Sequence, residues 1–469
     1  MNLAYDKEEF YRAHLARDPR FDGQFFVAVK TTLIYCRPIC PARKAHLRNL
    51  EFFLHAAQAE AAGFRPCLRC RPEAAPGSTA WMGTSAIIQR AIRLMDAFAT
   101  EELSVSELAA KLGVGERWLR ELFQQQVGVS PSAILMSKKL DIARNLLDES
   151  TLSITEIAFS SGFHSIRRFN DAFKTRFQKT PSAFRKAPLS KSRLALKLSY
   201  RTPYAWDKMM LFFKNRAIPQ LEWVDNDSYQ RLITYGNIQG WFKATPNQHG
   251  KIAVEFKLNR PANIIEFVAR LKNIFDLDCD PMAVENGLTE DSQLTPFLDQ
   301  YRGLRIPGCW DGFELAVRAI IGQKISVKAA RTVLSRLVEA CGEQQLWDES
   351  IPLTRFFPTP ENILTADLSQ IGLTQSKIAT LKELASQMAN KSLILDGTEN
   401  LEEVCRKLLA IKGIGMWTVE YIAMRALRNP NAFPATDLEL KKQISRLQLN
   451  PEKWTPWRAY GAILLWNIL

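Results

Sequence analysis

The 469-residue sequence has no apolar run approaching the 18 residues that a membrane-spanning helix requires. Its first residues, MNLAYDKEEFYRAH, lack the apolar stretch between a basic start and a cleavage site that marks a signal peptide. These absences argue against a membrane or secreted protein. We therefore expect a soluble protein inside the cell with no membrane partner.

Cysteine is also scarce, with eight residues in the whole chain, yet Cys36, Cys40, Cys67 and Cys70 lie close together. Clustered cysteines in an intracellular protein form metal or catalytic sites more often than disulfides. A C-x3-C pair and a C-x2-C pair, separated by 26 residues, can close a tetrahedron around one ion. Four thiolates suit zinc, so we predict one Zn2+ per chain. On spacing alone, a purely structural zinc site is the favoured interpretation. The remaining cysteines show no such spacing, and we expect no iron–sulfur cluster.

Acidic residues are too few to balance the basic ones. The formal charge is +13 and the pI about 9.3, which indicates a polyanionic partner. Residues 1–187 hold 27 Lys and Arg against 19 Asp and Glu, and the remainder holds 35 against 30. The positive charge is therefore spread along the chain, so several parts of it could contact one polyanion.

The chain is too long for one hydrophobic core. Segments rich in Pro, Ala, Gly and Ser at 71–80 and 185–193 predict linkers. The periodicity of apolar residues predicts a small α+β domain, an all-α domain, a second α+β domain and a second all-α domain. Their expected bounds are 1–76, 85–187, 194–282 and 283–469.

The residues around the four cysteines resemble a known family. RFDGQFFVAVKTTLIYCRPICPARKAH and AAGFRPCLRCRPE are similar to the N-terminal domain of Ada, the methyl phosphotriester repair protein, over about residues 5–73. The resemblance implies that Cys36 accepts a methyl group from a DNA phosphate. A zinc-bound thiolate stays deprotonated and is the nucleophilic form of cysteine. Methylation would change the site's charge from −2 to −1, so DNA binding should strengthen and the site could act as a sensor.

Two similar units follow, each with a helix, a short turn and a second helix. They read LSVSELAAKLGVGERWLRELFQQQVGVSPSAI and LSITEIAFSSGFHSIRRFNDAFKTRFQKTPSAF. The duplication resembles the paired helix-turn-helix domain of the AraC family. Arg117, Arg120, Arg167 and Arg168 lie early in the second helices, where they would face the DNA major groove. For any single arginine, a solvated position on the helix surface is an equal alternative.

The segment LLAIKGIGMWTVEYIAMRAL places Gly413 and Gly415 between two helical patterns, which predicts a helix-hairpin-helix. A glycine hairpin lets backbone N–H groups approach a DNA phosphate, and a helix N-terminus adds a favourable dipole. The segment FPATDLELKK follows, with Asp437 before a helical pattern. A hairpin and an aspartate at this distance resemble the helix-hairpin-helix DNA glycosylase superfamily.

Within that superfamily, residues 195–469 are most similar to AlkA, the 3-methyladenine DNA glycosylase II. The matching pieces are PYAWDKMMLFF, FDLDCDP, IPGCWDGFELAVRAIIGQ, IKGIGMWT and TPWRAYGAILLW. The resemblance implies a TATA-binding-protein-like α+β domain before the all-α glycosylase domain. It also implies that Asp437 is catalytic. The residues that it places around the base pocket are Trp417, Tyr421, Trp466 and Phe212.

These residue types suit the chemistry. An alkylated purine such as 3-methyladenine already carries positive charge and leaves without a general acid, so one carboxylate can stabilise the sugar cation or orient water. Aromatic rings hold a flipped, cationic base by cation–π attraction. For any one tryptophan, packing in the core is the favoured alternative, and Asp437 also fits a helix N-cap.

One position departs from the AlkA pattern. Where AlkA-like enzymes place an apolar wedge after GQ, this sequence has Lys324 in IGQKISV. An apolar side chain unstacks bases readily, whereas lysine would use its aliphatic stem and reach a phosphate. The way in which the base is flipped is therefore left open by the sequence.

Together the resemblances imply a DNA alkylation repair protein. A monofunctional glycosylase would hydrolyse alkylated purines from DNA, fused to a zinc-thiolate methyl acceptor that regulates transcription of the adaptive response. We expect a cytoplasmic, bacterial monomer that associates with the nucleoid, binds alkylated and promoter double-stranded DNA, and contacts RNA polymerase. The alternative is a transcription regulator whose glycosylase half binds damage without cutting. A DNA-packaging protein would leave Cys36 and Asp437 unexplained.

Overall fold

The computed structural model describes residues 7–17, 21, 25–67, 69–70, 72, 86–97, 104–149, 153–185, 194–247, 250–259, 264–345 and 351–468. Of the two predicted linkers, 71–80 and 185–193, all but Pro72 and Arg185 lie outside the described residues. Within the described part of the chain, no helix is long and apolar enough to cross a bilayer.

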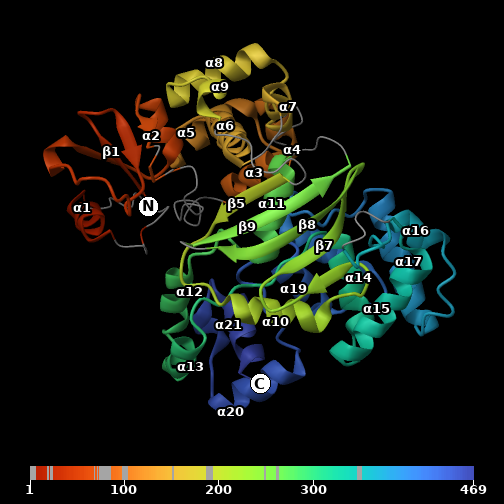
Figure 1. Cartoon of the computed structure of the whole chain (residues 1–469). Helices are drawn as coiled ribbons and strands as arrows, with labels where there is room; N and C mark the ends of the chain where they lie inside the picture. The colour runs from red at the N-terminus through yellow and green to blue at the C-terminus, as the bar shows by residue number, and fades with distance from the viewer. Residues whose placement is uncertain are drawn as a thin grey trace.

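The first region is a four-stranded sheet of order β3-β1-β2-β4, drawn in red in Figure 1. Aromatic side chains fill its core. Phe25 stacks on Phe10 with ring centroids 4.2 Å apart, and Tyr35 meets Phe26 edge to face at 5.9 Å. The elements are α1 (Lys7–Ala16), β1 (Phe26–Val29), β2 (Ile34–Cys36), η2 (Leu47–Asn49), β3 (Leu50–Phe53), α2 (Ala56–Ala61) and β4 (Arg65–Pro66).

The second region is helical and repeats one unit twice, as the sequence predicts. In each unit a serine caps the first helix and a glutamate three residues on completes the capping box: Ser104 with Glu107, and Ser153 with Glu156. Gly113 ends the first of these helices at φ +72°, a left-handed conformation that glycine adopts without strain. The helices are α3 (Ala86–Ala97), α4 (Val105–Leu112), α5 (Glu116–Gln126), α6 (Pro131–Glu149), α7 (Ile154–Ser160), α8 (Ile166–Phe177) and α9 (Pro181–Phe184).

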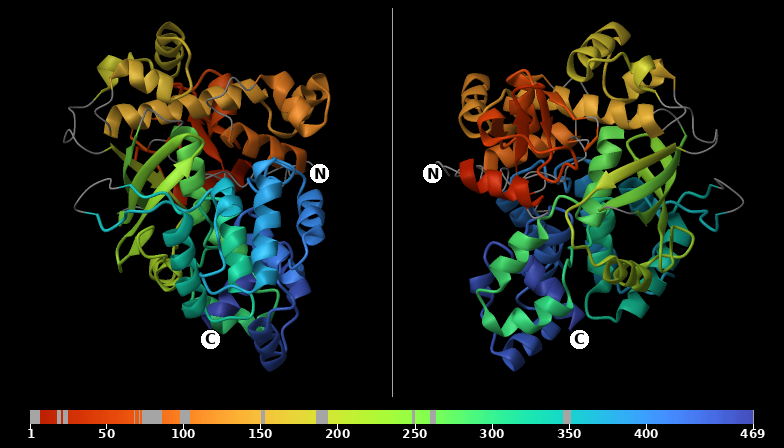
Figure 2. Two further views of the ribbon diagram at one scale, coloured as in Figure 1. Left: turned by 90° about the vertical axis from the view of Figure 1, so that its right-hand side faces the viewer. Right: turned by 60° about the vertical axis from the view of Figure 1, so that its left-hand side comes forward.

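The third region is an antiparallel five-stranded sheet of order β5-β9-β8-β7-β6. Its apolar face and helices α10 and α11 share one hydrophobic cluster with α6, α7 and α8 of the preceding region. The helical region therefore packs on this sheet, as the views in Figure 2 show. The elements are β5 (Leu194–Ser199), α10 (Trp206–Arg216), β6 (Glu222–Val224), β7 (Tyr229–Tyr235), β8 (Ile238–Asn247), β9 (Lys251–Leu258) and α11 (Ile264–Phe275).

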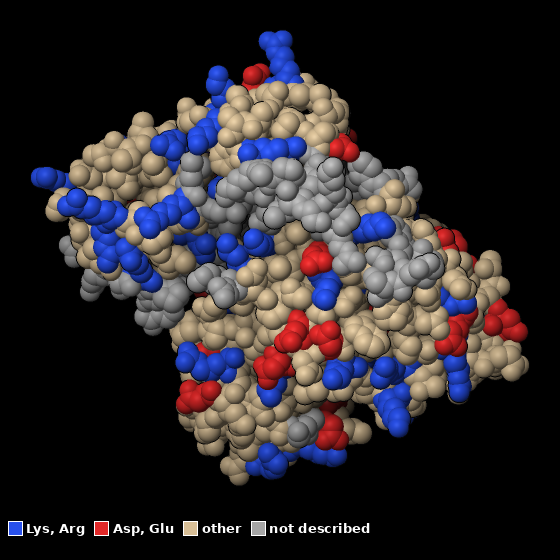
Figure 3. All heavy atoms as spheres, viewed as in Figure 1, with Lys and Arg blue, Asp and Glu red and all other residues tan. Residues whose placement is uncertain are grey.

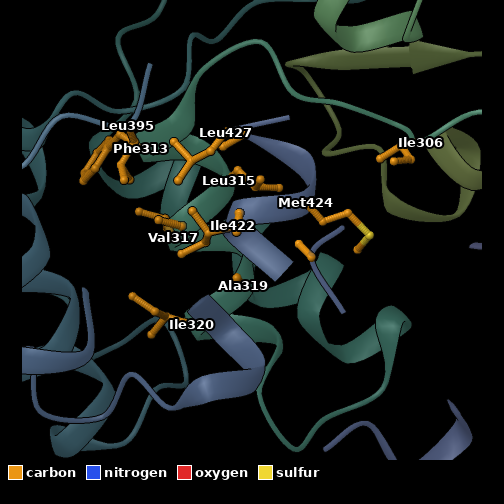
Figure 4. Close-up of a cluster of buried hydrophobic side chains, with 14 of the residues drawn as sticks. Ile306, Phe313, Leu315, Val317, Ala319, Ile320, Leu395, Ile422, Met424 and Leu427 are labelled. Atoms are coloured by element: carbon orange, nitrogen blue, oxygen red, sulfur yellow. The ribbon is translucent and has the colours of Figure 1, made fainter. Parts of the chain in front are cut away.

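The last region is helical and has the largest hydrophobic cluster among the described residues. At its centre α14 packs against α19, through side chains such as Val317 and Ile422 (Figure 4). The elements are α12 (Pro281–Leu288), η5 (Ser292–Leu294), α13 (Thr295–Gln300), α14 (Gly312–Gly322), α15 (Val327–Cys341), α16 (Pro360–Thr365), α17 (Gln375–Ala389), α18 (Leu401–Ala410), α19 (Met416–Arg425), α20 (Leu438–Leu447), η6 (Pro451–Trp454) and α21 (Arg458–Asn467). The predicted fold class, a multidomain chain of two α+β and two all-α parts, is confirmed.

Candidate metal centre and active site

The four clustered cysteines meet at one end of the first sheet. Strands β2 and β4 pair in parallel, which places Cys36 at the end of β2 beside Cys67, the residue that follows β4. The Cys67 N–H donates to the Tyr35 carbonyl at 2.9 Å. The Sγ atoms of all four cysteines lie within 4.8 Å of one another, and Cys36, Cys40 and Cys67 are buried. The backbone N–H of Arg37 donates to Cys70 Sγ at 3.4 Å.

Four thiols at this separation form a donor set for a soft cation. Hydrogen bonds from Cys40 and the other thiols, together with burial, raise the pKa of the Cys36 thiol. A cation among the sulfurs has the opposite effect because it stabilises thiolates. The cluster is thus suited to a metal ion, and tetrahedral sulfur coordination favours zinc.

The second helices of the two helix-turn-helix units, α5 and α8, differ in the charges that surround their arginines. On α5, Arg117 pairs with Glu121 at 3.0 Å and Arg120 pairs with Glu116 at 2.7 Å, all within one exposed helix face. On α8, Arg167 and Arg168 are exposed, and no carboxylate of the described chain pairs with them. The unpaired positive charge is therefore on the second unit. Figure 3 shows further Lys and Arg side chains gathered on the visible face of the first region.

The predicted glycine hairpin joins α18 to α19. Gly413 has φ +97°, and a Cβ there would lie 2.3 Å from Thr380 Oγ1, so only glycine fits. Gly415 is the N-cap of α19, and nothing lies within 4 Å of where its Cβ would stand. The hairpin thus presents an open helix N-terminus, which is a favourable place for a phosphate. Gln323, just before Lys324, donates to the Gly413 carbonyl at 3.1 Å.

Lys324 is exposed in the loop between α14 and α15, at φ +60°, and its side chain contacts no described residue through a hydrogen bond or ion pair. Its neighbours Ile325 and Val327 are exposed apolar side chains, 40% and 43% accessible. The loop beside the hairpin therefore offers apolar groups as well as the lysine.

Asp437 is the N-cap of α20 and also the centre of an aromatic cluster. Its Oδ1 accepts backbone N–H bonds from Glu439 at 3.1 Å and Leu440 at 3.0 Å. Trp417 Nε1 donates to Oδ2 at 2.9 Å, and Trp466 Nε1 donates to Oδ1 at 3.3 Å. Three helices, α19, α20 and α21, thus hold one half-buried carboxylate.

The predicted aromatic residues lie around this carboxylate. Tyr421 stacks on Trp417 with centroids 5.0 Å apart and an interplanar angle of 11°, and its ring is 6.2 Å from that of Trp466. Phe212, from α10, joins the group through Arg425, whose guanidinium carbon lies 4.8 Å from the Phe212 centroid and 5.1 Å from that of Tyr421. The structure therefore brings all four aromatic residues into one cluster with Asp437.

Sequence reasoning missed Arg425. It donates to Tyr421 Oη at 2.6 Å. Burial raises the pKa of Tyr421, but the charges of Arg425 and Arg216 and the hydrogen bond from Arg425 outweigh burial and lower it. Tyr421 and Arg425 are four residues apart on α19, a spacing that places two residues on the same helix face. This spacing is the sequence feature that could have indicated a contact between them.

A cavity of about 510 Å³ lies elsewhere, between the β7–β8 turn and the segment 357–360. Tyr235, Arg270 and Trp310 are among its lining residues, and none of the predicted site residues is. The chemistry-bearing cluster is therefore the one around Asp437, because it combines a positioned carboxylate with aromatic surfaces.

Comparison with known families divides the chain into four matches. Residues 9–73 match the metal binding domain of Ada and residues 108–187 a helix-turn-helix domain. Residues 195–311 match the AlkA N-terminal domain and residues 317–462 the HhH-GPD superfamily base excision DNA repair protein. The four resemblances seen in the sequence are thereby confirmed.

Individual relatives cover either the whole chain or parts of it. A probable bifunctional transcriptional activator/DNA repair enzyme AlkA of Mycobacterium tuberculosis is 36% identical over 99% of this chain and 97% of its own length. DNA-3-methyladenine glycosylase 2 of Escherichia coli is 29% identical over 57% of this chain and 95% of its own. The solved structure of a 3-methyladenine DNA glycosylase from Archaeoglobus fulgidus shares the fold, with a TM-score of 0.50 and 24% identity over 57% of this chain and 96% of its own.

Proposed function

Because this chain belongs to the family of the bifunctional transcriptional activator/DNA repair enzymes AlkA, we propose that it repairs DNA alkylation in two ways. Its C-terminal half hydrolyses the N-glycosidic bond of alkylated purines. Its N-terminal half accepts a methyl group from a DNA phosphotriester and regulates transcription. The observation that carries the glycosylase function is the carboxylate of Asp437, held by the indole N–H groups of Trp417 and Trp466.

The glycosylase reaction places its positive charge next to Asp437. When the C1′–N bond breaks, both electrons go to the base nitrogen and the sugar becomes an oxocarbenium-like cation. Four donors fix the carboxylate, and Oδ2 accepts only one of them, so it keeps a lone pair that is available to the sugar or to water. Water then bonds to C1′ and releases a proton. A charge held in place before the reaction stabilises the transition state without reorganisation.

The aromatic cluster supplies the base pocket. A base within duplex DNA must leave the stack before its glycosidic bond is accessible. Trp417, Tyr421, Trp466 and Phe212 offer π surfaces for an alkylated base, each contact being worth roughly 0.5–2 kcal/mol for a cation. Gly413 and Gly415 present backbone N–H groups to a phosphate nearby. Lys324 contacts the backbone, and the exposed Ile325 beside it fills the space that the flipped base leaves.

The N-terminal half provides the acceptor. Cys36, Cys40, Cys67 and Cys70 hold one Zn2+ per chain, which keeps the thiolates deprotonated at neutral pH. Cys36 Sγ attacks the methyl carbon, and the electrons of the C–O bond return to the phosphate oxygen. Arg117, Arg120, Arg167 and Arg168 contact promoter DNA. We further propose a cytoplasmic monomer without an iron–sulfur cluster that contacts RNA polymerase at its promoter.

The test of the glycosylase function is Asp437→Asn. Asparagine is an equally good N-cap, so the fold and binding to an abasic-site duplex should persist, while release of 3-methyladenine should stop. A matched control is Asp311→Asn, at the N-cap of α14, where Asp311 accepts the Glu314 N–H at 3.0 Å. This variant should excise normally. Release by Asp437→Asn within a few-fold of wild type would remove Asp437 from the mechanism. A wild-type protein that binds damaged DNA tightly and releases no base would establish the alternative, a regulator that senses damage.

A further inference from the structure

Arg425 is a buried cation beside the candidate base pocket. The residue is 7% exposed, at the C-terminus of α19. Its Nε donates to the Pro307 carbonyl at 2.6 Å and its Nη2 donates to the Gly308 carbonyl at 3.0 Å. Nη1 donates to Tyr421 Oη. Across the described ranges, no carboxylate forms an ion pair with this guanidinium. A buried charge without a counterion is costly, and this one lies against the rings of Tyr421 and Phe212 at the candidate base pocket.

A second cation lies on the same side of the pocket. The Arg216 guanidinium carbon is 3.9 Å from the Phe212 centroid, so that ring contacts both Arg216 and Arg425. The negative charge lies at the other end of the cluster, because Tyr421 stacks on Trp417 and Trp417 donates to Asp437. The cluster thus has positive charge behind Phe212 and Tyr421 and negative charge at Asp437.

We propose that Arg425 is a charge-positioning residue, whose field, acting through Tyr421 and Phe212, directs the electron pair of the breaking glycosidic bond toward the base. The proposal rests on the glycosylase function given above. As the C1′–N bond breaks, positive charge leaves the base and appears on the sugar. Charge therefore moves away from Arg425 and toward Asp437, and both residues favour that movement. A cationic base becomes neutral as it leaves. A neutral base leaves with negative charge and then takes a proton from water.

For a cationic base, the positive field of Arg425 has opposite effects on binding and on bond breakage. The field repels the bound base, and this repulsion weakens in the transition state as the positive charge moves to the sugar. For a neutral base it barely affects binding and stabilises the leaving group. A residue that only supports the fold would weaken both steps together, so the two explanations differ in the sign of the change in binding.

The experiment compares wild type with Arg425→Met in the full chain, on duplexes that contain either 7-methylguanine, a cationic base, or hypoxanthine, a neutral one. Single-turnover rates report bond breakage. Dissociation constants are measured in the Asp437→Asn background, where the substrate survives. For 7-methylguanine we expect binding about tenfold tighter and a rate about fivefold lower, because the rate cannot fall by more than the binding gained when the repulsion is removed. Unit charges on the order of 10 Å apart at an effective dielectric of about 20 support that magnitude. For hypoxanthine we expect a lower rate with unchanged binding.

Two further variants separate charge from structure. Arg425→Lys keeps the charge and should bind and react within about threefold of wild type. Arg305→Met is a matched control, because Arg305 is also buried, donates to the Cys279 carbonyl at 2.8 Å and lies 5.1 Å from the Tyr204 ring. Within the described part of the chain, no hydrogen bond or ring contact joins Arg305 to the Asp437 cluster. The variant should therefore lose stability, with rate and binding affected in the same direction. If Arg425→Met does not fold, Arg216→Met tests the same field.

The outcomes decide between the proposals. Weaker binding of 7-methylguanine together with a lower rate, as in Arg305→Met, would overturn the role of Arg425, and so would no change in either quantity. A wild-type protein that releases no base from any duplex would instead overturn the glycosylase function itself. Faster release by Arg425→Met than by wild type would show that the field opposes the reaction, and would also refute the proposal.

Discussion

Replacing Arg176 with methionine is expected to open the contact between the zinc domain and the helix-turn-helix region. Arg176 projects from α8, and its side chain is 4% exposed. Its Nη2 pairs with Glu60 of α2 at 2.7 Å and with Asp141 of α6 at 2.6 Å. Tyr35, next to Cys36, donates from its hydroxyl to Glu60 at 2.6 Å. The guanidinium thus joins the strand of the methyl acceptor to the second helix-turn-helix unit.

The loss of stability in this variant is set by the two carboxylates, Glu60 and Asp141, that remain without the guanidinium. Removing one partner of a buried ion pair costs about 3–5 kcal/mol, because the other charge is left uncompensated. Two carboxylates share one guanidinium here, and burial raises the pKa of Asp141 from 3.8 to about 7, although Arg176 lowers it. The folded state therefore binds this proton more tightly than the unfolded chain does. The stability that the protonated Asp141 contributes to the folded state is fully present below about pH 4 and is lost as the pH rises through about 7. The free energy of unfolding changes by about 4 kcal/mol at most over this range.

The variant should consequently be more damaging at high pH. At pH 5.5 Asp141 keeps its proton and only the Glu60 pair is lost. At pH 8 Asp141 has lost its proton in the wild type, whereas in the variant, without the lowering effect of Arg176, it must keep the proton or ionise without a cation beside it, and either costs stability. Hydrogen exchange followed by mass spectrometry, on peptides from α2 and α8, measures the opening directly. Relative to wild type we expect exchange faster by roughly 10² to 10³-fold at pH 8 and by less at pH 5.5.

The double variant Arg176→Met with Asp141→Asn is the matched test of this reasoning. It removes one of the two facing carboxylates, so it should recover part of the protection at pH 8 and lose most of the difference between the two pH values. Peptides from α14, in the last region, serve as the internal control. Unchanged exchange in α2 and α8, or a larger effect at pH 5.5 than at pH 8, would refute the argument.

Two further predictions concern the N-terminal half. After exposure to methylated DNA, peptide mass spectrometry should find one methyl group, on Cys36, and a methyl on Cys40, Cys67 or Cys70 instead would identify a different acceptor. On a promoter duplex, the Arg167→Gln, Arg168→Gln double variant should reduce the slope of log K against log salt by up to about 2, since each phosphate contact contributes about 0.9. The Arg117→Gln, Arg120→Gln pair should reduce it less, because both arginines already pair with glutamates on α5; equal reductions would contradict this.

The parts of the molecule that the sequence predicts are those set by short spacing. The cysteine pairs, the repeated helix-turn-helix units and the hairpin at Gly413 each lie within a few tens of residues, and their chemistry is visible in residue types alone. The link from Asp437 to Trp466 was reachable only through the resemblance to AlkA, because no local pattern connects α20 with α21.

The parts that escape the sequence depend on contacts between distant segments. In the sequence, nothing distinguishes Arg425 from the other Lys and Arg residues, which number 62 in all. Its contact with Phe212 exists only because α10 packs beside α19 in the folded chain. Arg176 reads as the basic end of an exposed helix, yet its side chain is buried by residues of two other helices. In both cases a tertiary contact buries a charged side chain, and the periodicity of apolar residues along the sequence does not predict such burial.

Asp437 shows that a capping role and a catalytic role are compatible in one residue. The two backbone N–H bonds of α20 both go to Oδ1, whereas Oδ2 receives only the Trp417 indole. The helix therefore orients the carboxylate through one oxygen and leaves the other with a lone pair. A short side chain is needed for this division, since the N-cap geometry requires the carboxylate to turn back onto its own helix. The same capping bonds that begin α20 thus hold the reacting group rigid, which is the condition for electrostatic stabilisation of a cationic sugar.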